Sequence, residues 1–193
     1  MKRVLNVGGN KKEIPLPRYY AGWQHDLLDI DPAVRPDVLC DARELQRLPR
    51  EQYDSVYCSH NLEHYYPHEV PRVLAGFRHV LKEGGFADII VPNVGAVMQE
   101  AVERKLDIED VLYVSPAGPI TVRDVIYGYG VEIARSGNDF YAHKTGFTEK
   151  SLIGVLQDSG FPIVYVAAGG REIRALAFAA APSPYAKTLL DLP

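Results

Sequence analysis

Residues 4–31, "VLNVGGNKKEIPLPRYYAGWQHDLLDID", decide the fold class of this chain. The stretch begins as an apolar strand that runs into a glycine pair, Gly8 and Gly9, and it ends as a second apolar strand that closes on aspartate. In open α/β sheets, a glycine turn after the first strand lets the backbone approach a ligand at the carboxyl edge of the sheet. The stretch therefore predicts a ligand-binding turn at the end of the first strand.

The segment after this turn does not suit a phosphate. A dinucleotide site needs a third glycine and a helix whose N-terminus faces the pyrophosphate. This chain instead continues as "GGNKKEIPLP", and Pro15 and Pro17 disfavour a regular helix from residue 11. Asp29, at the end of the second strand, is placed to accept hydrogen bonds from both hydroxyls of a ribose. We therefore expect a ligand that contains a ribose but no pyrophosphate.

Acidic residues also end the neighbouring strands. Asp31 follows Asp29 closely, and Asp41 ends the third strand, where it can accept a hydrogen bond from an exocyclic amine of a base. The alternative interpretation is that these aspartates only end strands and cap turns, as aspartate often does.

The rest of the chain alternates between β-rich runs and helical segments, which predicts an α/β sheet with mostly parallel strands. An apolar stripe predicts a helix from Val70 to Leu81 that "KEGG" (82–85) ends, and Thr148 is the expected N-cap of a second helix over 148–160. Two apolar runs joined at Gly169 and Gly170 predict an antiparallel hairpin. Strands are expected at 3–8, 25–30, 37–40, 54–59 and 86–92, and the residues from Pro182 onward are expected to be poorly ordered.

Composition restricts the class of protein. The chain has 193 residues, of which 47% are hydrophobic, so it fits a single domain, 1–193. Its net charge of −4 disfavours nucleic acid as a partner, and no apolar run is long enough to span a membrane. Cys40 and Cys58 suit buried thiols in a reducing compartment better than a disulfide, so a cytoplasmic location is expected.

Six motifs, in order along the chain, resemble those of class I S-adenosylmethionine-dependent methyltransferases, in particular small bacterial ones with a "LEH" turn after strand four. They are "VLNVGG", "LLDIDP", "VLCDARELQ", "YDSVYCSHNLEHY", "FRHVLKEGGFADIIVPN" and "HKTGFTEKSLIGVLQDSGF". The resemblance implies a Rossmann-like, seven-stranded, mostly parallel sheet with a C-terminal antiparallel hairpin and helices on both faces. It also implies S-adenosylmethionine as cofactor, which has a ribose but no phosphate. The cofactor-binding residues expected are Gly8, Gly9, Asn10, Asp29, Ile30, Asp41, Ala42, Ser59 and His60.

The acceptor is expected to be a small or sugar-like molecule, methylated at oxygen. The turn "CSHN" (58–61) differs from the Asn/Asp-Pro-Pro-Tyr/Phe turn with which similar enzymes hold a planar amine. A hydroxyl needs a base, and His60 and His143 are the candidates. Asp139 and Tyr141, with His143, are the expected substrate residues, in a lid-like insertion at about 93–147. His143 could instead tie this lid to the turn by a hydrogen bond. Neither the acceptor nor the oligomeric state can be read from the sequence.

The stretch "HNLEH" (60–64) also fits the H-x-x-E-H pattern of inverted zinc proteases. That pattern needs a helix with both histidines on one face and a distant acidic ligand. Here it follows a strand directly, and Pro67 ends any helix early, so no metal is expected. His64 and Glu63 could also act by fixing the turn through hydrogen bonds to backbone.

Two other functions remain open. An NAD(P)-dependent or nucleotide-binding oxidoreductase would explain Asp29 but not the missing third glycine. A non-catalytic cofactor-binding module would explain why "GGNKKE" departs from the usual glycine turn.

Overall fold

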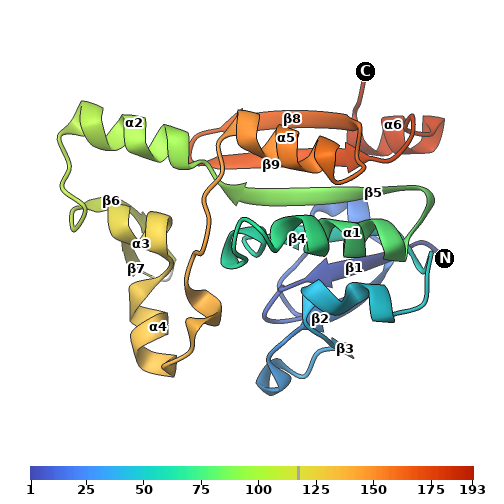
Figure 1. The fold of residues 1–193 in the computed structure, drawn as a ribbon, viewed down its shortest axis with the longest axis horizontal. Helices are drawn as coiled ribbons and strands as arrows, with labels where there is room; N and C mark the ends of the chain where they lie inside the picture. The colour runs from blue at the N-terminus through green and yellow to red at the C-terminus, as the bar shows by residue number, and fades with distance from the viewer. Residues whose placement is uncertain (117) are drawn as a thin grey trace.

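A seven-stranded sheet forms the centre of the molecule (Figure 1), with the strand order β3-β2-β1-β4-β5-β9-β8. The structure is a computed structural model that describes residues 1–116 and 118–193. The first five strands run parallel, and β9 pairs antiparallel with both β5 and β8. The strands are β1 (Arg3–Val7), β2 (Gln24–Asp29), β3 (Val38–Leu39), β4 (Tyr53–Ser59), β5 (Leu81–Pro92), β8 (Ile163–Gly169) and β9 (Glu172–Phe178). The predicted Rossmann-like sheet and its C-terminal hairpin are confirmed.

One face of the sheet is covered by α1 (Val70–Val80), α5 (Glu149–Asp158) and the 3-10 helix η3 (Ala42–Arg47). The apolar stripe of α1 is fully buried against inward-facing strand residues such as Val56 and Ile89. Thr148 caps α5 as predicted, because its hydroxyl accepts a hydrogen bond from the Ser151 amide. "KEGG" lies outside α1, in the long strand β5.

No α-helix joins β1 to β2, so the opposite face is covered by other elements. The 3-10 helix η1 (Arg18–Tyr20) and Trp23 pack an aromatic cluster on this face, with Tyr20 and Phe86 stacked. The C-terminal helix α6 (Pro184–Leu190) completes the cover and buries Ala186. The prediction of a poorly ordered terminus after Pro182 is wrong, because Ser183 caps α6 and apolar residues anchor it.

A buried ion pair lies under this aromatic cover. Asp88 on β5 is fully buried, and Arg174 on β9 donates from Nε to Asp88 Oδ1 at 2.9 Å. The hydroxyls of Tyr19 and Tyr20 also donate to this carboxylate, and Arg174 donates to the Tyr19 hydroxyl oxygen at 2.7 Å. Burial next to Asp88 raises the pKa of both tyrosines. This network joins the segment that replaces the missing helix to the centre of the sheet.

The insertion after β5 has structure of its own (Figure 1). Val97, Leu112, Val122 and Val125 form a small separate core that joins its elements. These elements are α2 (Val94–Arg104), β6 (Val111–Ser115), β7 (Gly118–Thr121), α3 (Val122–Tyr127), α4 (Gly130–Ser136) and the 3-10 helix η5 (Asp139–Tyr141). In the described part of the chain, no helix is long and apolar enough to cross a membrane.

Candidate active site

A cavity of about 460 Å³ opens where the carboxyl ends of β1, β2 and β4 meet η5 of the insertion. The sheet side contributes strand-end and turn residues, and the insertion contributes the residues around η5. The lining residues are Gly8, Asn10, Asp29, Ile30, Asp31, Val34, Asp41, Arg43, His60, Asn61, His64, Tyr65, Tyr66, Asp139, Phe140, Tyr141 and Lys144. Four other site residues predicted from the sequence do not line this cavity: Gly9, Ala42, Ser59 and His143.

The glycine turn follows β1 and faces the 3-10 helix η4 (Leu62–His64). Gly8 has a left-handed backbone, with φ of 70°, and a β-carbon there would lie 2.1 Å from Asn61 Nδ2. At Gly9 a β-carbon would lie 2.1 Å from Asn6 Nδ2. Both glycines are therefore required by close neighbours, and at Gly8 also by backbone conformation.

We expect Gly8→Ala to lower the melting temperature more than Gly22→Ala does. A left-handed conformation costs a non-glycine residue about 1–2 kcal/mol, and each kcal/mol corresponds to about 2–4 °C in a chain of this size. Gly22 also has positive φ, 80°, but nothing lies within 4 Å of a β-carbon there, so this variant measures the backbone effect alone. Equal melting temperatures for the two variants would show that Asn61 moves aside at no cost.

Asp29 and Asp31 lie on the cavity wall after β2. Asp31 caps the short 3-10 helix η2 (Pro32–Val34), since its side chain accepts from the Ala33 amide. Asp29 Oδ1 accepts from the Asp31 amide at 3.0 Å. No hydrogen bond to Asp29 Oδ2 is found among the described residues, so this oxygen is available to a ligand.

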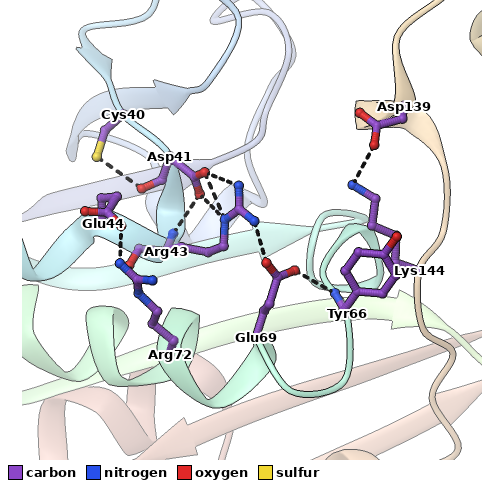
Figure 2. A network of polar contacts seen from close by, with 9 residues as sticks. All are labelled: Cys40, Asp41, Arg43, Glu44, Tyr66, Glu69, Arg72, Asp139 and Lys144. Atoms are coloured by element: carbon purple, nitrogen blue, oxygen red, sulfur yellow. Dashed lines mark hydrogen bonds and ion pairs between the residues drawn. The ribbon is translucent and has the colours of Figure 1, made fainter.

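Asp41 is already engaged by protein groups (Figure 2). It caps η3 through the Arg43 amide, and the Arg43 guanidinium donates to both of its oxygens. Arg43 also pairs with Glu69, which accepts from the Tyr66 amide. Burial opposes the charge on Asp41, but the hydrogen bonds from Arg43 outweigh it and lower the pKa of Asp41. Turn capping therefore accounts for much of the role of Asp41, although its carboxylate does face the cavity.

The insertion closes the other side of the cavity. Lys144 lies 3.2 Å from Asp139 Oδ2 and above the ring of Tyr66 (Figure 2). Tyr141 has its pKa raised by burial and by the neighbouring carboxylates of Glu132, Asp31 and Asp29. Tyr141 therefore lies near the side of the cavity that carries Asp29 and Asp31.

His60 lies between two carboxylates. Its Nε2 is 3.0 Å from Glu172 Oε1, and its Nδ1 is 3.5 Å from Glu63 Oε1. Burial disfavours the charged imidazole, but the two carboxylates outweigh burial and raise the pKa of His60 to about 10. With a carboxylate near each ring nitrogen, His60 is poorly placed to take a proton from an acceptor.

His143 lies behind the cavity wall, and burial lowers its pKa, which favours the neutral form. Its Nδ1 is 2.9 Å from the Val125 carbonyl oxygen, and its ring packs edge-on against His64 with 4.9 Å between centroids. This hydrogen bond lies within the insertion, to α3, and does not tie the insertion to the turn after β4. His143 Nε2 points toward Glu63, at 3.9 Å from Oε1.

The comparisons with known proteins agree with this geometry. Residues 21–89, from the segment before β2 into β5, match a family model described as a methyltransferase domain. A SAM-dependent methyltransferase from Archaeoglobus fulgidus superposes with a TM-score of 0.58 at 17% identity, covering 91% of this chain and 85% of that one. A SAM-dependent methyltransferase from Methanosarcina mazei gives a TM-score of 0.53 at 17% identity, with 91% and 92% covered.

Residues 21–89 carry the methyltransferase-domain match, and the chain as a whole has the fold of SAM-dependent methyltransferases. An N1-methyltransferase of 1,6-didemethyltoxoflavin from Burkholderia thailandensis, solved with S-adenosylhomocysteine, shares the fold with a TM-score of 0.50 at 18% identity, covering 91% of this chain and 69% of that one. At these identities the structures establish the fold of this chain and not its acceptor. No significant match was found among curated protein sequences.

The residues around the cavity fit S-adenosylmethionine as cofactor. The glycine turn adds no side chain of its own to the cavity wall, and Asp29 Oδ2 is an available acceptor for a hydroxyl. Asn61 Oδ1 is buried, accepts no hydrogen bond from any described residue and belongs to the cavity lining, so it can accept from an amino group. Sequence reasoning missed Asn61, although it follows His60 in the same turn.

Proposed function

We propose that this enzyme transfers the methyl group of S-adenosylmethionine to an oxygen atom of a small or sugar-like acceptor. One observation carries the proposal: the cavity joins the strand-end residues of a cofactor site to polar residues of the insertion. Its volume, about 460 Å³, suits small molecules. A cytoplasmic location remains part of the proposal, since Cys40 and Cys58 are free thiols.

Asp29, Gly8, Asn10 and Asn61 would hold the cofactor, with Ile30 beside it. The cofactor supplies an electrophilic methyl group on a sulfonium. The protein contributes orientation and exclusion of water, and well-oriented reactions gain about 7–11 kcal/mol in favourable cases. Closure of the cavity by η5 serves both purposes.

The acceptor would contact Asp139 and Tyr141, which η5 places on the insertion side of the cavity. An unactivated hydroxyl must lose its proton during the transfer. His143 is the better candidate for the base, because its Nε2 is not held by a hydrogen bond in the described structure. His143 lies behind the cavity wall. Proton transfer from the acceptor hydroxyl to His143 therefore requires a bridging water molecule or a shift of His64.

Asp29→Ala should weaken S-adenosylmethionine binding without unfolding the protein. A hydrogen bond to a charged acceptor contributes about 1.5–3 kcal/mol, which is about 10- to 150-fold in dissociation constant. Isothermal titration calorimetry with the wild type and the variant measures this. Asp158→Ala, an exposed aspartate at the end of α5, is the matched control and should bind normally. Unchanged affinity in folded Asp29→Ala protein would overturn the ribose assignment.

Production of S-adenosylhomocysteine with a panel of small hydroxyl and sugar acceptors tests the transfer itself. Turnover with one of them, absent without acceptor, is the expected result. Tight cofactor binding with no turnover on any acceptor would favour a non-catalytic module. Binding of a reduced nicotinamide cofactor, seen as a change in its fluorescence, would favour an oxidoreductase.

A further inference from the structure

We propose that Glu63, His64 and His143 form a binding site for one divalent transition-metal ion at the wall of the cavity. One ligand atom from each residue lies within 4.8 Å of the others. This inference opposes the expectation of no metal drawn from the "HNLEH" pattern. It meets the proposed function at His143, because an Nε2 that holds the ion cannot also take a proton from the acceptor. The ion can nevertheless be measured without cofactor or acceptor.

The burial of the Glu63 carboxylate is the first observation that points to a bound ion. Its side chain is only 1% exposed, yet neither carboxylate oxygen accepts a hydrogen bond from any described residue. Burying a carboxylate is costly unless it is paired or coordinates a metal, and among the described residues Glu63 has only the ion pairs with His60 and His143. His60 Nδ1 and His143 Nε2 both approach the same carboxylate oxygen of Glu63, Oε1, at 3.5 and 3.9 Å. The other oxygen, Oε2, is available to bind a metal ion.

The orientation of the two imidazoles is the second observation. His64 Nδ1 lies 3.0 Å from the Ala142 carbonyl oxygen, and His143 Nδ1 lies 2.9 Å from that of Val125. A carbonyl only accepts, so in the neutral ring each Nδ1 carries the proton and each Nε2 keeps a lone pair. Metal-binding histidines characteristically hold their second nitrogen in this way. Both rings are therefore in the tautomer that a metal ion requires.

The spacing suits an ion after a small adjustment. Ligands about 2.0–2.1 Å from a tetrahedral ion lie about 3.3 Å from one another. The His143–Glu63 distance of 3.9 Å and the overall spread of 4.8 Å exceed this value by amounts that side-chain rotation can supply. Two imidazoles and one carboxylate select Zn²⁺ or Fe²⁺ and related ions rather than Ca²⁺ or Mg²⁺. Three protein ligands also leave a position open, as in catalytic sites.

The backbone brings these three residues together from distant parts of the chain. Lys144 and Thr145 donate their amides to the Glu63 carbonyl oxygen at 2.8 and 3.1 Å. His143 donates its amide to Tyr127 at the end of α3. Glu63 and His64 belong to the core and His143 to the insertion, so a bound ion would clamp the insertion over the cavity.

Zn²⁺ alone is the probe for the test. Titration of chelator-stripped protein should show one ion per chain and a rise in melting temperature that excess chelator reverses. Glu63→Gln, His64→Ala and His143→Ala should each weaken binding by about 100-fold or more, since even loss of a supporting residue typically weakens it 10- to 100-fold. His68→Ala is the matched control, because His68 is an exposed histidine near the same turn that is outside the cluster.

Hydrogen exchange tests whether the bound ion holds the insertion over the cavity. Zn²⁺ should slow exchange in residues 139–147 of the wild type and of His68→Ala, but not of His143→Ala. Circular dichroism establishes which variants are folded, and any one folded ligand variant suffices for the comparison. Absence of Zn²⁺ binding to the wild type, or equal binding by a folded ligand variant, would overturn the site. Loss of binding in His68→Ala would place the ion elsewhere.

Discussion

His143→Ala is expected to reduce turnover about 10²- to 10⁴-fold while leaving S-adenosylmethionine affinity nearly unchanged. A loss of this size is typical when a positioned base is removed. The loss should lie in kcat, because His143 does not line the cavity and contributes no binding contact there. Its neutral imidazole, held by the Val125 carbonyl, faces Glu63 and His64 at the cavity wall.

The measurement compares kcat for the best acceptor with cofactor affinity from calorimetry. His68→Ala should retain full turnover. Loss of cofactor binding or of thermal stability in proportion to activity would make His143 a structural residue of the insertion. Unchanged turnover would show that the base lies elsewhere or that the acceptor needs none. If stripping the wild type of metal reproduces the loss, His143 acts through the ion and not as a base.

Arg174→Met should be strongly destabilising although Arg174 lies outside the cavity. It leaves the fully buried Asp88 without its cationic partner. Removing one partner of a buried ion pair costs about 3–5 kcal/mol. At about 2–4 °C per kcal/mol for a chain of this size, the melting temperature should fall by about 6–20 °C.

Urea denaturation and calorimetry measure this change. Lys12→Met is the control, since Lys12 and Asp37 form an ion pair in which both side chains are exposed. An exposed pair contributes about 1 kcal/mol or less. If the two variants lose the same stability, the hydroxyls of Tyr19 and Tyr20 suffice to hold Asp88, and the guanidinium contributes little.

The sequence by itself determined the sheet and the edge at which the cavity lies. The β-rich runs, the Thr148 cap and the glycine pair before the last strand are local signals, and each produced the expected element. Two prolines excluded a helix after β1, and that region is a loop with a single 3-10 turn. Asp29 was placed by its position at a strand end, because the carboxyl ends of parallel strands meet at one edge.

Only the tertiary structure decided what surrounds that edge. The terminal helix α6 depends on apolar packing against the sheet, which its short sequence does not reveal. Asn61 reaches over Gly8, and His143 meets Glu63 and His64 across about eighty residues of chain. The "HNLEH" spacing could not predict this cluster, because the third ligand comes from the insertion. Hydrogen bonds between distant backbone segments fix such contacts, and local periodicity carries no signal for them.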